Sequence, residues 1–306
     1  MLLRFNILHQ CKTHSIIYSV KNKYFRINSN KVFIAVWLSF VQIKSFFSFW
    51  RVSHCFSRKK GMGDSMNFYN FGNSGDKSTL HELLLEHFKQ QNIVPFFGSG
   101  FTRGYPAARG RVPSVAELKT ELADIIVKIE NYSDGERSEL EHLKLSELSD
   151  IFWPILERDD VPQEYRDQFD AYIEDHFCDV HDLPVEYQKL VDCRWRYLYT
   201  LNYDDAIENA SNKLKVIVPY SNQNKRWLKQ KRCLYKIHGD SAKFLETGES
   251  KFCILSTQQY LQALNDSENL SMRQNLETDF SSNNLIFFGC SLLDELDILF
   301  AAGTKF

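Results

Sequence analysis

Short apolar runs that alternate with helical patterns constrain the fold of this chain most strongly. Residues 93–97 (Ile-Val-Pro-Phe-Phe) carry no polar side chain, which is typical of a strand buried on both faces of a parallel sheet. Similar short runs recur along the second half of the chain, and helical patterns separate them. The predicted strands are 93–97, 195–201, 215–219, 233–237, 252–255 and 285–288. This alternation predicts an α/β fold with a mostly parallel, doubly wound sheet.

Helical patterns also fill the long interval between the first two of these strands. Ser114 with Glu117 forms a capping box, and apolar residues follow it at helical spacing. Two more amphipathic helices are predicted at 138–153 and 164–177, and a further one precedes the first strand at 79–91. Later helices are predicted after the caps Ser256 and Ser271. We therefore expect a helical insertion between the first and second strands.

Four of the predicted strands run into glycine-containing or polar motifs. The carboxyl ends of parallel strands lie at one edge of a sheet, where open α/β folds bind their ligands. The motifs are Gly98-Ser99-Gly100-Phe101, Thr200-Leu201-Asn202-Tyr203-Asp204-Asp205, His238-Gly239 and Gly289-Cys290-Ser291. Together they predict a nucleotide site that also carries out chemistry.

Each motif has a structural explanation as well as a functional one. Gly98 and Gly100 allow close approach of the backbone to a phosphate, or they form an ordinary turn. His238 is a candidate general base with ligand space beside Gly239, or a histidine bonded within a loop. Asp205 has a simpler role, as the cap of the following helix. The Gly289 motif could be a tight turn, and we interpret Cys290 as a packing residue.

The order of the four motifs resembles the sirtuin superfamily, and most closely the sirtuin-like NAD hydrolase domains of bacterial antiviral defence proteins. The resemblance spans about residues 90 to 300. It implies a Rossmann-like domain that binds NAD+ and breaks the bond between nicotinamide and ribose. NAD+ would be the substrate, with no other cofactor.

The resemblance also assigns roles to individual residues. Asn202 would orient the ribose or the attacking water, Asp204 would contact the nicotinamide carboxamide, and His238 would be the general base. The residues implied to bind the rest of the dinucleotide are Gly98, Ser99, Gly100, Phe101, Thr200, Gly289 and Ser291. An oriented amide, a carboxylate and a base are suited to the oxocarbenium-like state of glycosidic cleavage.

Two departures from the deacylating sirtuins favour water as the acceptor, and a third changes the loop after Gly100. Leu201 stands where those enzymes have Gln. Their four-cysteine zinc module is missing, so no metal is expected. Ala107-Ala108-Arg109 replaces their Asp-Phe-Arg. Two other hypotheses remain open: a non-catalytic NAD or ADP-ribose-binding module that regulates a partner, and a deacylase or ADP-ribosyltransferase.

Charge divides the chain into two parts. Residues 1–61 hold eleven Lys and Arg and no Asp or Glu, whereas residues 62–306 hold 26 basic and 39 acidic residues. We interpret 1–61 as a basic, aromatic-rich leader, either a targeting segment or translated upstream sequence with the true start at Met62 or Met66. Its longest apolar run is about a dozen residues, short of the ~20 that span a bilayer. Residues 62–306 would form the sirtuin-like domain, which could be truncated at its C-terminus.

Composition also limits the partners and the location. The acidic body argues against nucleic-acid binding. Seven cysteines without a C-x-x-C pair argue against a disulfide framework or a zinc ribbon and fit a cytoplasmic protein. We expect no membrane contact, a homo-oligomer, and a sensor domain or partner protein that controls activity.

Overall fold

The computed structural model describes residues 93–221 and 232–290, together with 82, 85–91 and the short segments 6–8, 16–17, 26–27 and 33–36. In the four short segments before residue 37 and at 280–282 only the backbone is described.

Five parallel strands form the centre of the structure. They are β5 (Ile93–Phe97), β6 (Leu198–Thr200), β7 (Leu214–Ile217), β8 (Arg232–Lys236) and β9 (Asn284–Phe288). Their spatial order is β9-β5-β6-β8-β7, and every neighbouring pair is parallel. The predicted Rossmann-like α/β fold with a mostly parallel sheet is therefore confirmed.

The described segments before residue 37 add strands at one edge of this sheet. β4 (Phe33–Val36) pairs with β9 in parallel, and β1 (Asn6–Leu8) pairs with β4 antiparallel. β2 (Ile16–Ile17) and β3 (Arg26–Ile27) form a separate two-stranded ribbon.

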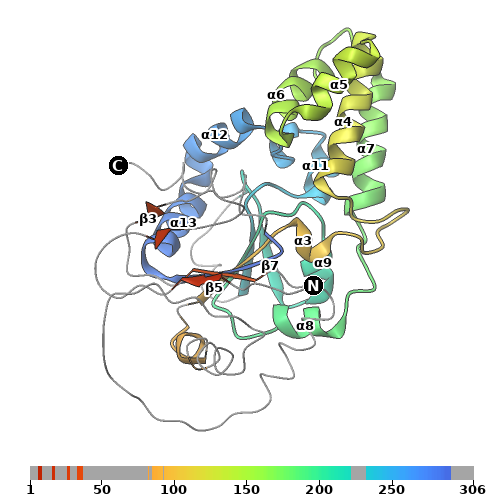
Figure 1. The fold of residues 1–306 in the computed structure, drawn as a ribbon. Helices are drawn as coiled ribbons and strands as arrows, with labels where there is room; N and C mark the ends of the chain where they lie inside the picture. The colour runs from red at the N-terminus through yellow and green to blue at the C-terminus, as the bar shows by residue number, and fades with distance from the viewer. Residues whose placement is uncertain are drawn as a thin grey trace.

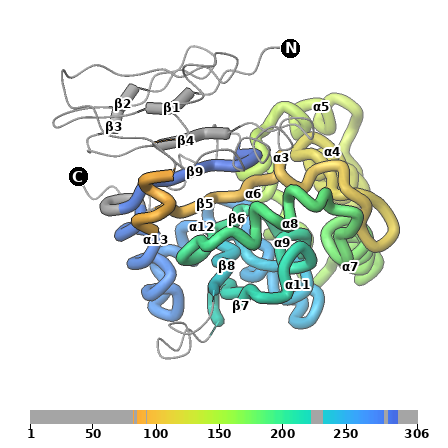
Figure 2. Tube along the Cα trace, turned by 90° about the horizontal axis from the view of Figure 1, so that it is seen from below, coloured from red at the N-terminus to blue at the C-terminus, as the bar shows by residue number. Residues whose placement is uncertain are grey.

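Helices cover both faces of the sheet, and strand residues point alternately to the two sides (Figure 2). On one face, α8 (Val185–Val191) and α9 (Ala206–Ala210) pack on Phe97, Leu198 and Leu234. On the other, α12 (Thr257–Asn265) and α13 (Leu270–Ser282) pack on Phe96, Tyr199 and Tyr235. The sheet is buried on both sides, which explains why its strands read as apolar runs.

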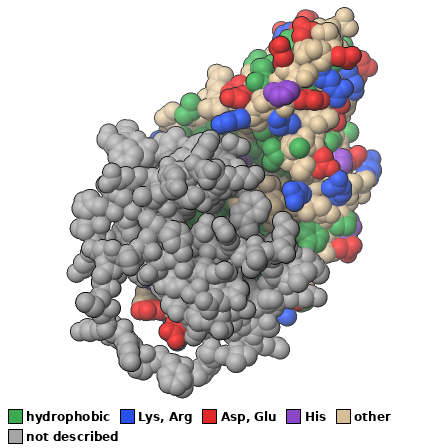
Figure 3. All heavy atoms as spheres, in the orientation of Figure 1, with side chains coloured by type: hydrophobic (Ala, Val, Ile, Leu, Met, Phe, Trp, Pro, Cys, Tyr) green, Lys and Arg blue, Asp and Glu red, His purple; other side chains and the backbone are tan. Residues whose placement is uncertain are grey.

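The predicted helical insertion lies between β5 and β6 and stands at one end of the molecule (Figure 1). After the short α3 (Ser99–Thr102) it consists of α4 (Val115–Glu130), α5 (Asp134–His142), α6 (Leu145–Leu156) and α7 (Gln163–Phe177). These helices share a core that includes Leu122, Phe152 and Phe169, together with Phe244 of α11 (Ser241–Thr247). Acidic and basic side chains are interspersed on its outer surface (Figure 3).

Capping explains why one predicted helix is in fact two. The expected helix at 138–153 is interrupted. α5 ends at His142, Leu143 has an extended backbone, and α6 begins at Leu145 after the N-cap Lys144. The Glu147 carboxylate accepts from the Lys144 backbone N–H at 2.8 Å at the start of α6. The apolar spacing of 138–153 predicts that Ile151 is buried, but its side chain is exposed.

Some of the other predicted helix starts are confirmed and one is wrong. The Ser114 and Ser256 capping boxes are confirmed. The Ser271 cap is wrong, because a 3-10 turn, η2 (Ser267–Asn269), leads directly into α13. Residues 85–89 are helical, as predicted for 79–91. The capping box that the sequence predicts at Thr79 and Glu82 begins outside the described residues.

The strand predicted at 252–255 is also wrong. Its residues are buried, but they form a 3-10 turn, η1 (Ser250–Phe252), and a loop that runs along the end of β8. Asp240 N donates to Phe252 O at 2.8 Å, and Ile254 N donates to His238 O at 2.9 Å. An apolar run can thus be buried by packing without joining the sheet.

Candidate functional site

Strand register brings the predicted motifs to one level of the sheet. The pairs Phe97↔Thr200, Phe97↔Phe288 and Thr200↔Lys236 align the last residues of β5, β6, β8 and β9. The chain then continues two residues beyond each of them, to Ser99, Asn202, His238 and Cys290. Parallel pairing alone therefore explains why motifs about 190 residues apart in the chain meet at one edge.

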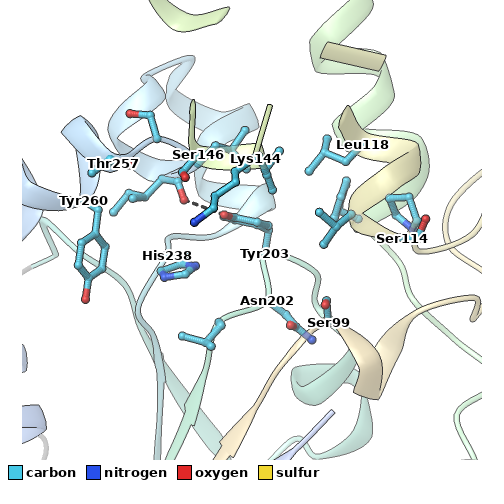
Figure 4. A pocket seen from close by; sticks show the side chains of 18 of the residues that line it. Ser99, Ser114, Leu118, Lys144, Ser146, Asn202, Tyr203, His238, Thr257 and Tyr260 are labelled. Atoms are coloured by element: carbon cyan, nitrogen blue, oxygen red, sulfur yellow. Dashed lines mark hydrogen bonds between the residues drawn. The ribbon is translucent and has the colours of Figure 1, made fainter. Parts of the chain in front are cut away.

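A cavity of about 390 Å³ lies between this edge and the helical insertion. Ser99, Asn202, Asp204 and His238 contribute its polar floor. The opposite wall comes from the starts of α4 and α6 and from α12, and it combines apolar side chains such as Leu118 with polar ones such as Ser114, Lys144 and Thr257 (Figure 4). The sequence predicted the floor but not this wall, since which helices face the sheet edge depends on tertiary packing.

The side-chain amide of Asn202 has a defined orientation. Its Nδ2 donates to Gly98 O at 3.2 Å and to Thr102 Oγ1 at 2.9 Å. The residue is only 4% exposed, and its Oδ1 has no hydrogen-bond partner within the described part of the chain. A buried acceptor of this kind is costly unless a ligand or water satisfies it. The amide therefore offers an acceptor on the cavity floor.

His238 offers a second unpaired atom. It is 8% exposed, it borders the same cavity, and its Nε2 is buried with no hydrogen-bond partner among the described residues. The ring lies between Tyr203 and Tyr260, with ring centroids 6.2 and 5.7 Å away. Burial lowers the pKa of His238 to about 4, so the imidazole is neutral at pH 7 and its basicity is reduced by burial in the cavity wall.

Asp204 is engaged differently. Its Oδ2 accepts from Thr102 Oγ1 at 2.8 Å, and its Oδ1 accepts from Ala206 N at 3.1 Å. Burial raises the pKa of this carboxyl, with the Lys236 ammonium opposing the shift. Thr102 links Asp204 to Asn202, which makes it a positioning residue that sequence reasoning missed. A hydroxyl one turn into the helix after Gly98-Ser99-Gly100 is the signal that could have indicated it.

The glycines of the first and last motifs pack on each other. Gly98 N donates to Phe288 O, and Gly100 N donates to Gly289 O, both at 2.9 Å. A Cβ on Gly289, which has φ +68°, would lie 2.2 Å from Phe101 N, and one on Gly100 would lie 2.7 Å from Gly289 O. The bare backbones therefore allow β5 and β9 to close together beside the cavity. Contact of these glycines with a phosphate stays a prediction.

Of the other predicted binding residues that the structure describes, only Ser99 borders the cavity. Phe101 is buried and stacks on Tyr187, with ring centroids 4.1 Å apart. Thr200 is buried; its Oγ1 donates to Phe97 O and accepts from Asn202 N, both at 3.1 Å. Its visible role is thus to position Asn202. Ser291 lies outside the described residues.

Two smaller expectations are corrected. The space beside Gly239 is not free for a ligand, since a Cβ there would lie 2.0 Å from Phe252 O. The Asp205 carboxylate does not cap α9; it accepts from Asp179 N at 2.8 Å and Val180 N at 2.9 Å and so holds the preceding loop. Cys290 is buried as expected of a packing residue.

Two kinds of feature are absent from the described residues. Within the ranges given above, no group of three or more His, Cys, Asp or Glu side chains is arranged to hold a metal ion. No helix of that part of the chain combines the length and apolar character needed to cross a membrane.

Comparison with known proteins gives one finding. The family model of the SIR2-like domain matches residues 196–301, about a third of the chain. The match includes Asn202, Asp204, His238 and Gly289. It begins after β5 and the helical insertion, which it does not cover. It supports a sirtuin-like family and an NAD-related activity for this chain. No curated protein matches the chain.

Proposed function

We propose that this protein is an NAD+ glycohydrolase that releases nicotinamide and leaves ADP-ribose. One observation carries the proposal: Asn202 Oδ1 and His238 Nε2 are both buried, both lack a partner in the described structure, and both residues border one cavity. The match to the SIR2-like domain supports NAD as the ligand.

The proposed roles follow from these atoms. Asn202 Oδ1 accepts a hydrogen bond from a ribose hydroxyl or from the attacking water and so holds it in place. As nicotinamide leaves, the ribose carbon gains oxocarbenium character, and water adds to it. The neutral His238 imidazole takes the proton that the water or the hydroxyl loses. The proposed contact of Asp204 with the nicotinamide carboxamide would need a further lone pair on a carboxylate that already accepts two hydrogen bonds.

Leu201 bears on the choice between hydrolysis and transfer. It occupies the Gln position of deacylating sirtuins, is 4% exposed, and borders the cavity with an apolar side chain. This favours hydrolysis over deacylation or ADP-ribosyl transfer.

The test is to incubate the full chain with NAD+ and follow free nicotinamide by chromatography. We expect Asn202→Ala and His238→Ala each to lower release at least 100-fold, the size of effect seen when one preorganised polar group is lost. His142→Ala, at an exposed histidine of α5 that does not border the cavity, is the matched control and should retain wild-type release. A full-rate Asn202→Ala or His238→Ala variant removes that residue from the mechanism.

Calorimetric titration with NAD+ separates the enzyme from a binding module. Binding without release would favour the non-catalytic module that regulates a partner. Neither binding nor release would contradict both hypotheses.

A role as a cytoplasmic antiviral defence effector, controlled by a sensor or by oligomerisation, is proposed on resemblance alone. It predicts that NAD+ falls in infected bacteria that express the wild-type chain but not in those that express Asn202→Ala. Equal NAD+ levels in the two strains, with both proteins expressed, would contradict it.

A further inference from the structure

Lys236 is the most unusual buried side chain near the site. It is fully buried at the end of β8, directly after the buried residues Cys233, Leu234 and Tyr235. Four oxygens lie within 3.0 Å of its Nζ: Tyr203 O (3.0 Å), Asp204 O (2.8 Å), Glu208 Oε1 (2.7 Å) and Asp240 Oδ2 (2.6 Å). Burying an ammonium is costly unless it is paired and hydrogen-bonded, and here both conditions are met.

These contacts join the two segments that carry the site. Tyr203 and Asp204 directly follow Asn202, and Asp240 lies two residues beyond His238. Asp240 is itself fixed, because its other carboxylate oxygen accepts from Lys243 N at 2.8 Å at the start of α11. The ammonium therefore fixes the position of the backbone at Tyr203 and Asp204, just after Asn202, relative to Asp240, just after His238.

The charge of Lys236 is maintained by its neighbours. Burial lowers the pKa of this ammonium, but the carboxylates of Glu208 and Asp240 outweigh burial, and the net shift is upward. A charged donor forms stronger hydrogen bonds to carbonyl oxygens than a neutral one does.

We infer that Lys236 is a positioning residue for the reaction: its bonds to the carbonyls of Tyr203 and Asp204 hold Asn202 Oδ1 in register with His238 Nε2. This inference rests on the proposed function. Lys236 does not border the cavity and acts only through the backbone that it holds.

The test compares Lys236→Met/Glu208→Gln with Glu208→Gln alone. Changing both residues avoids leaving the Glu208 carboxylate without its ammonium, while the single variant keeps the bonds from Lys236 to both carbonyls. We expect the single variant to keep kcat close to wild type. In the double variant we expect kcat to fall about 100-fold, the effect of about 1 Å of misplacement, with little change in KM. A purely structural role would lower the amount of folded protein without this split between kcat and KM.

A second measurement does not depend on turnover. The side-chain NH₂ of Asn202 donates two hydrogen bonds, so its protons should exchange slowly with solvent in protein labelled with ¹⁵N at asparagine. We expect fast exchange in the double variant and slow exchange in Glu208→Gln. Slow exchange together with unchanged kcat in a folded double variant would overturn the inference. If the wild-type protein releases no nicotinamide, the proposed function fails, while this measurement still decides whether Lys236 holds Asn202.

The double variant could fail to fold. Lys236→Gln/Glu208→Gln then replaces it, because the neutral amide sits on a shorter side chain and has one donor fewer than the ammonium. We again expect a lower kcat and faster exchange of the Asn202 amide protons than in Glu208→Gln. Values equal to those of that control would overturn the inference.

Discussion

The strand ends of β6 and β8 differ from those of β5 and β9, although all four carry motifs that looked alike as ligand sites. After β6 and β8, Asn202 and His238 each present a buried polar atom with no partner in the described structure. After β5 and β9, the backbone groups of Gly98 and Gly100 are already bonded to β9. In chain order, the motifs after β6 and β8 form the inner pair, whose unpaired atoms support the proposed ligand contacts. The motifs after β5 and β9 form the outer pair, which packs closely together.

The comparison shows that a glycine motif at a strand end has two possible uses that the sequence does not distinguish. Close backbone approach serves a phosphate or another strand equally well. A buried polar atom without a partner is a more specific sign of a ligand site. Its desolvation destabilises the folded protein, and packing does not offset that cost. We therefore expect substitutions at the outer pair to act on stability and those at the inner pair to act on activity.

Gly289→Ala should have the largest effect, and on folding. The added Cβ would lie 2.2 Å from Phe101 N at a left-handed φ of +68°. Strain and overpacking together should lower the free energy of unfolding by about 4 kcal/mol. Gly104→Ala is the control, since Gly104 has φ +86° but no atom within 4 Å of a Cβ; it should cost only about 1 kcal/mol. Urea denaturation of both variants measures the difference, and equal losses would contradict the packing explanation.

His238 should make stability depend on pH. Its pKa is about 4 in the folded protein, whereas an imidazole in its ordinary, solvated state has a pKa of 6.5. Below pH 6.5 the unfolded chain therefore binds the proton more readily than the folded protein does. Stability from this residue is complete above pH 6.5 and declines as the pH falls toward 4, by about 3 kcal/mol in total.

His238→Gln isolates this contribution from other titrating groups. The difference in unfolding free energy between wild type and variant, measured by urea denaturation from pH 4 to pH 7, should change by that amount. A constant difference across the range would show that the imidazole is not desolvated in the folded protein.

The fold was largely predictable because its signals are local. Glycines and polar residues directly after apolar runs located the strand ends, and Ser114 and Ser256 located two helix starts. The break at Leu143 was also visible in principle, since Glu147 stands three residues after the new N-cap position at Lys144. It was missed because a lysine is not a usual capping residue.

The site was predictable only in part because its remaining members depend on distant partners. Thr102 acts by joining Asn202 to Asp204, about 100 residues further along the chain. Lys236 pairs with Asp240, only four residues later, but also with Glu208, which lies 28 residues earlier in the chain. No local pattern records such pairings, whereas strand register could have been used to place Asn202 beside His238.

Thr102→Val tests the inner pair through its shared support. The change removes the hydroxyl that donates to Asp204 and accepts from Asn202 and leaves both with an unmet hydrogen bond. We expect a loss of about 2 kcal/mol in stability and slower nicotinamide release. Thr120→Val is the matched control, because Thr120 is exposed on α4 and its hydroxyl bonds only to Ala116 O one turn earlier. If both variants behave alike, Thr102 does not support the site.

Arg109→Ala should have the smallest effect. It tests whether the loop after β5 acts with the outer pair in packing or with the inner pair in the site. The Arg109 side chain is 63% exposed and pairs with Glu174 at 2.7 Å and Asp175 at 2.5 Å, both on α7. It lies in the stretch that replaces the Asp-Phe-Arg of deacylating sirtuins, yet it does not border the cavity. Exposed ion pairs contribute little to stability, so neither unfolding nor nicotinamide release should change measurably. A large rise in KM for NAD+ would instead show that Arg109 leaves α7 and contacts the substrate, and the loop would then belong with Asn202 and His238.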